Sequence, residues 1–127
     1  MEPKNAYQHD PLTAKIIGCC FEVHSAIGPG FPEKIYNRAL QIALAEKYLN
    51  FVAEKCFSVT YQRQEVGVFR CDICVNDVVI VELKSVTGYM PKLFTNQLLS
   101  YLKASRIKTG LLVNFGNTSC EVKRLSV

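Results

Sequence analysis

No stretch of the sequence restricts the fold more than the four β-branched residues Val78 to Val81, which run directly into Glu82-Leu83-Lys84. β-Branched residues favour extended backbone, and an unbroken apolar run is typical of a strand covered on both faces. After this strand, Pro91 opens a helix with a broad apolar face, and Thr109 to Phe115 indicates another buried strand. The strand–helix–strand order predicts a parallel pair of strands joined by a right-handed crossover.

The remaining elements complete an α/β fold, a mixed sheet of about five strands flanked by three helices. Asp10 is placed to cap a helix that starts at Pro11 and stops at Gly28, and Pro32 is placed to open a second one that ends near Tyr48. Three further strands are predicted, at Phe51–Gln62, at Val66–Val75 after a turn near Gln64, Glu65 and Gly67, and at about Cys120–Leu125 on a sheet edge. We expect residues 1–8 to form a flexible arm and residues 9–127 a single domain.

Composition excludes several classes of protein. A chain of 127 residues that is 49% hydrophobic can bury a sizeable core, which excludes wholesale disorder. The longest stretch without Asp, Glu, Lys or Arg, Thr109 to Cys120, is shorter than the roughly 20 residues of a membrane helix. No signal peptide is evident, so we expect a soluble, cytoplasmic protein without a membrane partner. The net charge of +4 permits nucleic-acid binding but does not require it.

The six cysteines favour neither disulfides nor a metal–thiolate site. Disulfides are not expected inside the cell. Cys71 and Cys74 have a CxxC spacing, but they fall in one predicted strand and should therefore point to opposite faces. A redox or metal–thiolate protein is thus a disfavoured alternative. We interpret all six as small buried apolar residues: Cys19, Cys20, Cys56, Cys71, Cys74 and Cys120.

Three charged residues lie where an apolar core has no use for them. Glu82 shares a strand face with Lys84, and Asp72 is embedded in an apolar strand. A buried carboxylate is costly unless it is paired or binds a metal. Two acids and a lysine on neighbouring strands could hold one hard cation, and Mg²⁺ suits such a site because it uses few protein carboxylates. The alternative is an inward salt bridge without metal.

The spacing of the acids supplies a geometric test. If Asp72 lies directly opposite Glu82 in an antiparallel pair, the loop between the strands must have an odd number of residues, most simply Asn76-Asp77-Val78. A plain two-residue turn would instead pair Asp72 with Val81 and place the acids on opposite faces. The metal hypothesis therefore predicts a three- or five-residue loop, or a bulge.

These residues resemble those of a known nuclease superfamily. Asp72 followed by Glu82-Leu83-Lys84 on the next strand resembles the PD-(D/E)XK core, although Cys71 stands where proline would precede the aspartate. Residues 30–36, Gly-Phe-Pro-Glu-Lys-Ile-Tyr, are similar to the signature of the GxxExxY family, which is assigned to that superfamily. Gly28-Pro29, Asn114-Phe115-Gly116 and the QxxxY pair Gln97 and Tyr101 extend the resemblance over residues 12–125.

The resemblance implies a restriction-endonuclease-like core and a role for each motif residue. Asp72 and Glu82 would bind Mg²⁺ or Mn²⁺, with the Leu83 carbonyl as a further ligand. Lys84 would orient or activate the attacking water and offset charge in the transition state. Glu33, expected on an inward helix face with Tyr36, Leu40 and Ala43, would complete the site directly or through a bound water. Gln97 and Tyr101 would position the substrate phosphate or a site side chain.

The implied function is a Mg²⁺-dependent nuclease, a hydrolase that cuts phosphodiester bonds of nucleic acid, expected to be DNA, without reading its sequence. Arg70, Lys92 and Lys103 are candidates for contacts with phosphates, and Arg70 would share a face with Asp72 on a regular strand. Specificity would come from nucleic-acid structure, a homodimer or a partner protein. The alternative is an inactive nuclease-fold module with a binding or regulatory role, which would have no need of Lys84.

Overall fold

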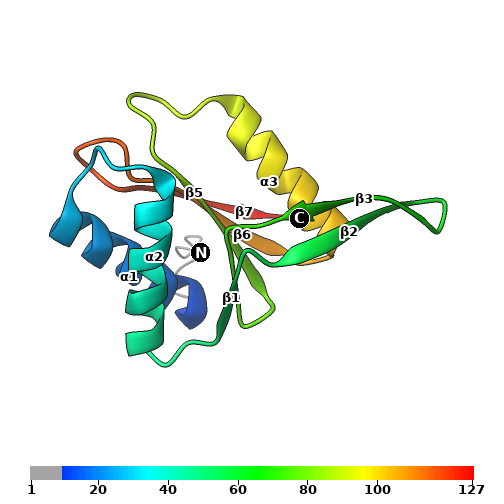
Figure 1. Ribbon diagram of the computed structural model, residues 1–127, viewed down its shortest axis with the longest axis horizontal. Helices are drawn as coiled ribbons and strands as arrows, with labels where there is room; N and C mark the ends of the chain where they lie inside the picture. The colour runs from blue at the N-terminus through cyan, green and yellow to red at the C-terminus, as the bar shows by residue number, and fades with distance from the viewer. Residues whose placement is uncertain (1–9) are drawn as a thin grey trace, which may run out of the picture.

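The computed structural model describes residues 10–127. Three helices, α1 (Pro11–Ile27), α2 (Glu33–Glu46) and α3 (Lys92–Ser105), accompany seven strands. Five strands form one mixed sheet, which confirms the predicted α/β class (Figure 1). Their order is β1 (Phe51–Ala53), β4 (Ile73–Val75), β5 (Val79–Lys84), β6 (Thr109–Asn114) and β7 (Glu121–Ser126). The expected arm over residues 1–8 lies outside the described residues.

The helix ends lie where the capping residues predict them. The Asp10 carboxylate accepts a hydrogen bond from the Thr13 amide at 3.2 Å, and Pro11 is the first residue of α1. Gly28 ends α1 with φ of 81°, a conformation that favours glycine. Pro32 directly precedes α2, and Pro91 directly precedes α3.

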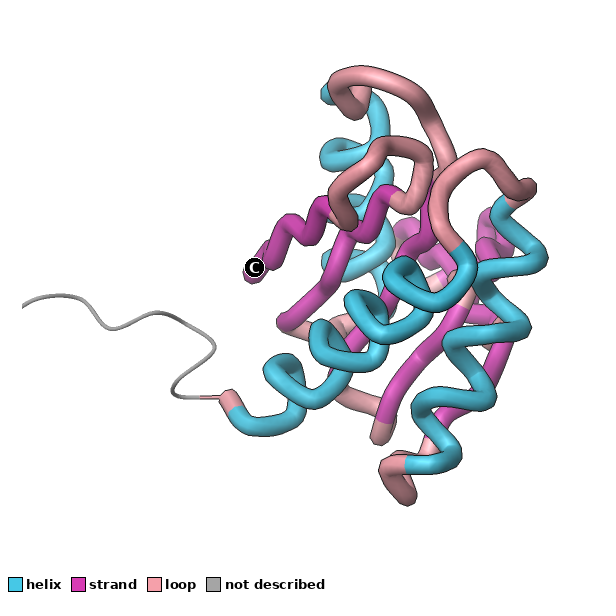
Figure 2. The backbone as a smooth tube through the Cα atoms, turned by 90° about the vertical axis from the view of Figure 1, so that its left-hand side faces the viewer, coloured by secondary structure: helices cyan, strands magenta, loops and turns pink. Residues whose placement is uncertain are grey.

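The central strands position the site. β5 and β6 are parallel and pair from Val79 with Thr109 to Lys84 with Asn114, as the strand–helix–strand order predicts. The other neighbours in the sheet are antiparallel, and β7 covers the edge beside β6. Helices α1 and α2 pack on one face and α3 on the other (Figure 2). Because side chains alternate along β5, Val81 and Leu83 point to the α1–α2 side, and Ile80 points to the α3 side.

Two strands that the sequence predicts as continuous are each broken, and the two breaks lie next to each other in the structure. The strand expected over Phe51–Gln62 is divided at Glu54 and Lys55 into β1 and β2 (Cys56–Tyr61), and Glu54 has φ of 54°. The strand expected over Val66–Val75 is divided at Cys71 and Asp72 into β3 (Gln64–Arg70) and β4. β1 and β4 stay in the sheet, whereas β2 and β3 form a separate hairpin. Local irregularities of this kind redirect side chains next to functional sites.

The hairpin turn also differs from the expectation. It consists of two residues, Gln62 and Arg63, so β3 begins at Gln64 and Gly67 lies inside the strand rather than near a turn. Two backbone hydrogen bonds join the two strand segments at the point where the chain passes from one sheet to the other. The Glu54 amide donates to the Asp72 carbonyl at 2.8 Å, and the Cys71 amide donates to the Lys55 carbonyl at 3.0 Å.

The break at Cys71 corrects the interpretation of the cysteines. Cys71 and Cys74 both pack in the cluster under α3 rather than on opposite faces, because the chain is not a regular strand between them. All six thiols are free. Cys56 is exposed and Cys120 half-buried, so only four of the six are buried. None of the helices in residues 10–127 is both long enough and apolar enough to cross a membrane.

Candidate active site

The β4–β5 connection places Asp72 opposite Glu82. Val75 pairs with Val79 and Ile73 with Val81, so the loop between them is Asn76-Asp77-Val78. This is the three-residue loop that the metal hypothesis predicts. Extending the same register by one position would set Asp72 against Glu82, whose side chain lies on the α3 side of the sheet with that of Ile80.

The two acids hold each other through backbone amides. The Asp72 amide donates to Glu82 Oε2 at 2.8 Å, and the Leu83 amide donates to Asp72 Oδ2 at 2.7 Å. The backbone pairing of β4 with β5 therefore ends before Asp72, because the Asp72 amide donates to a side chain instead of to the backbone of β5. Hydrogen bonds to a carboxylate are charge-assisted and fix its orientation. Each carboxylate keeps an oxygen with which to bind something else.

Burial and mutual repulsion make this pair electrostatically costly. Glu82 is only 5% exposed, and its pKa is raised to about 7 by burial and then by the charge of Asp72. Burial also raises the pKa of Asp72, although the hydrogen bond from Leu83 opposes the shift. No ion pair within residues 10–127 includes either carboxylate. Two desolvated carboxylates without a salt-bridge partner favour the uptake of protons or of a cation.

Lys84 lies on the same strand face as Glu82, and α3 holds its ammonium group. Lys84 Nζ is 4.4 Å from the centre of the Phe94 ring and 3.5 Å from Gln97 Oε1. The positive charge attracted to the ring face keeps the flexible lysine stem in one place. The charge of Lys84 lowers the pKa of Asp72 and of Glu82, against the larger effect of burial. The structure therefore brings Gln97 to the lysine.

Tyr101 lies one helical turn beyond Gln97. Its ring stacks on Phe69 at 4.1 Å with an interplanar angle of 13°. Burial raises the pKa of Tyr101, and the negative charges of Glu82 and Asp72 raise it further. The phenol is thus within electrostatic reach of both acids.

Glu33 lies at the rim rather than inside. It is the first residue of α2 and is exposed, so the expected inward orientation with Tyr36 and Leu40 is wrong for Glu33, although those two are buried. Partial burial raises its pKa, Lys84 lowers it and Asp72 raises it. Within residues 10–127, no three His, Cys, Asp or Glu side chains are grouped closely enough to ligate one metal ion.

A hydrogen-bond network that sequence reasoning missed ties the loop before Glu33 to the strand of Lys84. The buried Tyr36 hydroxyl donates to the Gly28 carbonyl at 2.6 Å and accepts from the Phe31 amide at 3.2 Å. The Ser85 hydroxyl donates to the Phe31 carbonyl at 2.6 Å. Tyr36 therefore belongs to the core, as expected, and also anchors this loop. Two features of the sequence could have indicated this network: the spacing of Tyr36 from Glu33, and the position of Ser85 directly after Lys84.

The Asn114-Phe115-Gly116 motif fixes the segment that follows Lys84. The Asn114 side chain accepts from the Val86 amide and donates to the Val86 carbonyl, both at 2.9 Å. Phe115 stacks on Tyr36 at 4.4 Å. A Cβ on Gly116 would lie 2.2 Å from the Val86 carbonyl oxygen, so only glycine fits this approach. The motif is thus a support of the site rather than a part of its chemistry.

The three basic candidates lie in different places. Lys92 is exposed at the start of α3, the end of the helix that carries Phe94 and Gln97. Arg70 is exposed and lies 3.5 Å from Glu54, and the break after it removes the regular strand that would align it with Asp72. Lys103 lies near the other end of α3. There it lines an open groove of about 730 Å³ with Arg106 and Lys108, apart from the acids.

The donor set fits a hard divalent cation. Asp72 and Glu82 supply carboxylate oxygens, and the backbone of Leu83 lies beside them, because its amide donates to Asp72 Oδ2. Oxygen ligands of this kind suit Mg²⁺ or Mn²⁺ better than thiolate-binding metals. The unpartnered negative charge of the two acids is what such an ion would neutralise.

Comparison with known proteins identifies a superfamily and a similar fold. Residues 10–125 match the family model of the PD-(D/E)XK nuclease superfamily. The fold is similar to the crystal structure of SSO0001, with a TM-score of 0.57 and 17% sequence identity over 94% of this chain. The match covers 59% of SSO0001, so this chain spans about three-fifths of its length. No curated protein matches the sequence.

Proposed function

The chain belongs to the PD-(D/E)XK nuclease superfamily, and from this we propose that it hydrolyses phosphodiester bonds of nucleic acid with a divalent cation, and that its substrate is DNA. The observation that supports the proposal best is the reciprocal hydrogen bonding of Asp72 and Glu82, with Lys84 on the same strand face. This arrangement brings two carboxylates together and places an ammonium group on the strand face of Glu82.

The cation in this proposal is Mg²⁺ or Mn²⁺, held by Asp72, Glu82 and the Leu83 carbonyl. When bound, such an ion supplies Lewis-acid chemistry, because it lowers the pKa of water and stabilises negative charge on phosphate oxygens. The hydrogen bonds from the Asp72 and Leu83 amides fix both carboxylates before the ion arrives, so little reorganisation accompanies binding.

Lys84 would act on the attacking water and on the phosphate. Its ammonium group can donate a hydrogen bond to orient the water, and its charge opposes the negative charge that develops on the phosphate oxygens. Phe94 and Gln97 both contact the ammonium group. They are therefore positioning residues for Lys84 in this proposal.

Glu33 and Tyr101 would define the borders of the reacting centre. Glu33 at the rim would hold a water that contacts the ion, and Tyr101 would donate a hydrogen bond to a substrate phosphate. Lys92, at the start of α3, would contact a neighbouring phosphate. Arg70 and Lys103 would contact phosphates farther along the nucleic acid.

Several finer assignments belong to the same proposal. We assign the chain to the GxxExxY group on Gly30, Glu33 and Tyr36, and we take residues 9–127 as one functional domain. A homodimer or a partner protein would supply specificity for nucleic-acid structure. The free thiols fit a reducing compartment such as the cytoplasm.

Cleavage assays with Mg²⁺ on single-stranded, duplex, flap and four-way DNA test the proposal. We expect cleavage of at least one substrate by the wild-type protein and none by Lys84→Ala, with both proteins equally folded by circular dichroism. Lys123→Ala removes an exposed charge on the edge strand β7 and should cleave normally. Unchanged cleavage by Lys84→Ala would refute the role of the lysine. Binding without cleavage by the wild type would favour the inactive module.

A further inference from the structure

The β2–β3 hairpin is an element that the chemistry at the acids does not use. Within residues 10–127 its two strands pair only with each other, and the hairpin extends away from the rest of the molecule (Figure 1). The six residues of β2 correspond to a reach of about 20 Å at 3.3 Å per residue, and β3 has seven residues. Both of its edges are unpaired within the described residues, so the ribbon is open to contact with another molecule.

The base of the hairpin is anchored beside the acids. Phe57 stacks on Phe69 at 5.2 Å, and Phe69 stacks on Tyr101 at 4.1 Å. β3 ends at Arg70, only two residues before Asp72. The hairpin therefore has a defined direction from the candidate active site, and whatever its tip contacts lies at a fixed distance from Asp72.

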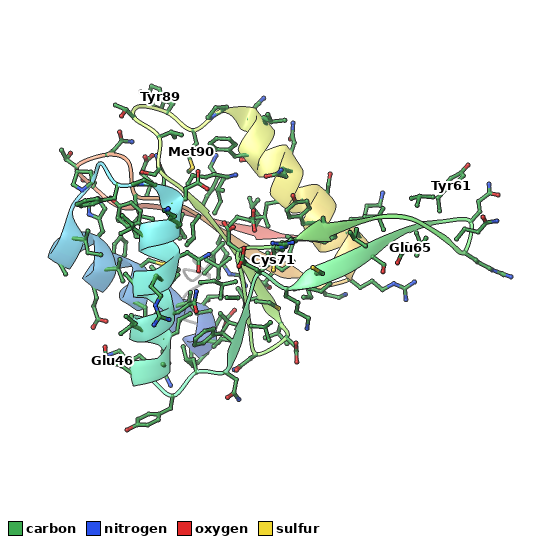
Figure 3. All side chains as sticks on the ribbon, in the orientation of Figure 1. Glu46, Tyr61, Glu65, Cys71, Tyr89 and Met90 are labelled. Carbon is green, nitrogen blue, oxygen red and sulfur yellow. The ribbon has the colours of Figure 1, made fainter. Side chains whose placement is uncertain are left out.

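The tip carries side chains that can form contacts but that form few within the protein. Tyr61, Gln62, Arg63 and Gln64 are all exposed, and Tyr61 lies at the far end of the hairpin (Figure 3). Arg63 takes part in no ion pair of residues 10–127. The only hydrogen bond among these four side chains joins Gln62 to the Tyr61 hydroxyl at 3.2 Å.

The backbone of the turn points to a role other than folding. Gln62 and Arg63 have φ of 49° and 65°, the left-handed conformation that a two-residue hairpin turn requires at both positions. Asn-Gly adopts this turn with the least strain, whereas Gln-Arg adopts it at a cost in stability. A strained pair of exposed, hydrogen-bonding residues at the end of an arm is typical of a binding element.

We propose that this tip enters a groove of duplex nucleic acid beside the phosphate that is cut, an inference that rests on the proposed function. A two-stranded ribbon fits the major groove, which is about 12 Å wide, and Arg and Gln are side chains that bond base edges or phosphates there. At 3.4 Å per base pair, a reach of about 20 Å spans about six base pairs. The substrate therefore needs a duplex arm of at least that length on one side of the cut.

Equilibrium binding by fluorescence anisotropy, without divalent cations, tests this inference. Arg63→Ala should bind a duplex arm of about twelve base pairs about tenfold more weakly than wild type. The same variant should bind an arm of about four base pairs as wild type does, because the tip extends past its end. Lys123→Ala, which removes one exposed charge on β7, should bind both arms as wild type does.

A second variant separates function from folding. Replacing Gln62-Arg63 by Asn-Gly should raise the melting temperature by a few degrees because it relieves the strained turn, and should weaken binding to the long arm. A variant that is more stable and yet binds less tightly cannot be explained by misfolding.

Three results would overturn the inference. Arg63→Ala could bind the long arm as tightly as the wild type does, or it could lose as much affinity for the short arm or for single strands as for the long arm. The wild-type protein could also form a dimer that the tip variants dissociate. The last result would mean that the hairpin, with Val66 and Val68 exposed, pairs with a second copy instead. Cleavage without any effect of the tip contradicts this inference alone. Arm-dependent binding without cleavage contradicts only the nuclease proposal.

Discussion

Asp72 and Glu82 fix each other across neighbouring strands. The amide of Asp72 donates to the Glu82 carboxylate at 2.8 Å, and the Asp72 carboxylate accepts from Leu83, the residue after Glu82, at 2.7 Å. Each acid is therefore held by the backbone next to the other. This arrangement keeps two repelling carboxylates close together, at a cost that a bound cation would offset.

The pH dependence of stability should reveal this repulsion. Glu82 has a pKa of about 7 in the folded protein and 4.5 as an ordinary glutamate, so between these values the folded state binds more protons than the unfolded state. The free energy of unfolding should therefore fall by roughly 3 kcal/mol as pH rises from 4.5 to 7, and then level off. Urea unfolding without divalent cations measures this slope.

Glu82→Gln is the control for this slope. The amide does not ionise, so most of the decrease in stability between pH 4.5 and 7 should disappear in this variant. Saturating Mg²⁺ should oppose the decrease in the wild-type protein, because the ion binds the deprotonated carboxylates. A wild-type stability that rises over this pH range would contradict the raised pKa of Glu82.

Removing one hydroxyl tests the anchoring of the loop before Glu33. Tyr36→Phe keeps the stacking on Phe115 but loses the hydrogen bonds to Gly28 and Phe31. We expect a loss of about 1–3 kcal/mol in stability and faster amide hydrogen exchange at Gly28, Gly30 and Phe31. Tyr48→Phe, at a tyrosine that is 94% exposed, should change neither measurement. Exchange at wild-type rates in Tyr36→Phe would show that the hydroxyl does not hold this loop.

Two glycines should respond in opposite directions to alanine. Gly116→Ala places a methyl group against the Val86 backbone, where neither side can yield easily, and should destabilise the protein by about 1–3 kcal/mol. Gly18 lies within α1 with open space around it, so Gly18→Ala should stabilise the protein by about 0.5–1 kcal/mol. Thermal unfolding of both variants checks this contrast, and a harmless Gly116→Ala would mean that the segment after Lys84 is not tightly held.

The sequence predicted the features that depend on local pattern. Caps and prolines located the starts of α1, α2 and α3, β-branched residues located β5, and an apolar run located β6. In an antiparallel pair, the numbers of facing residues have a constant sum that the loop length sets. A three-residue loop therefore predicts that Asp72 faces Glu82, in the register that pairs Ile73 with Val81.

What the sequence could not predict depends on contacts between distant segments. The breaks at Glu54 and at Cys71–Asp72 are stabilised by hydrogen bonds between the two strands, and neither strand alone carries a proline or a glycine at that point. The same breaks put Cys71 and Cys74 on one side and release the hairpin. The exposure of Glu33 depends on where α2 begins relative to the sheet, which helix periodicity does not specify.

Calorimetric titration with Mn²⁺ tests the central claim most directly, that Asp72 and Glu82 form a cation site. The wild-type protein should bind Mn²⁺, and Asp72→Asn, which keeps an oxygen to accept from Leu83, should bind it at least about tenfold more weakly. Asp77→Asn, on the exposed β4–β5 loop, should bind like the wild type. Equal Mn²⁺ affinity in the wild type and in Asp72→Asn, or no binding by the wild type, would contradict the account.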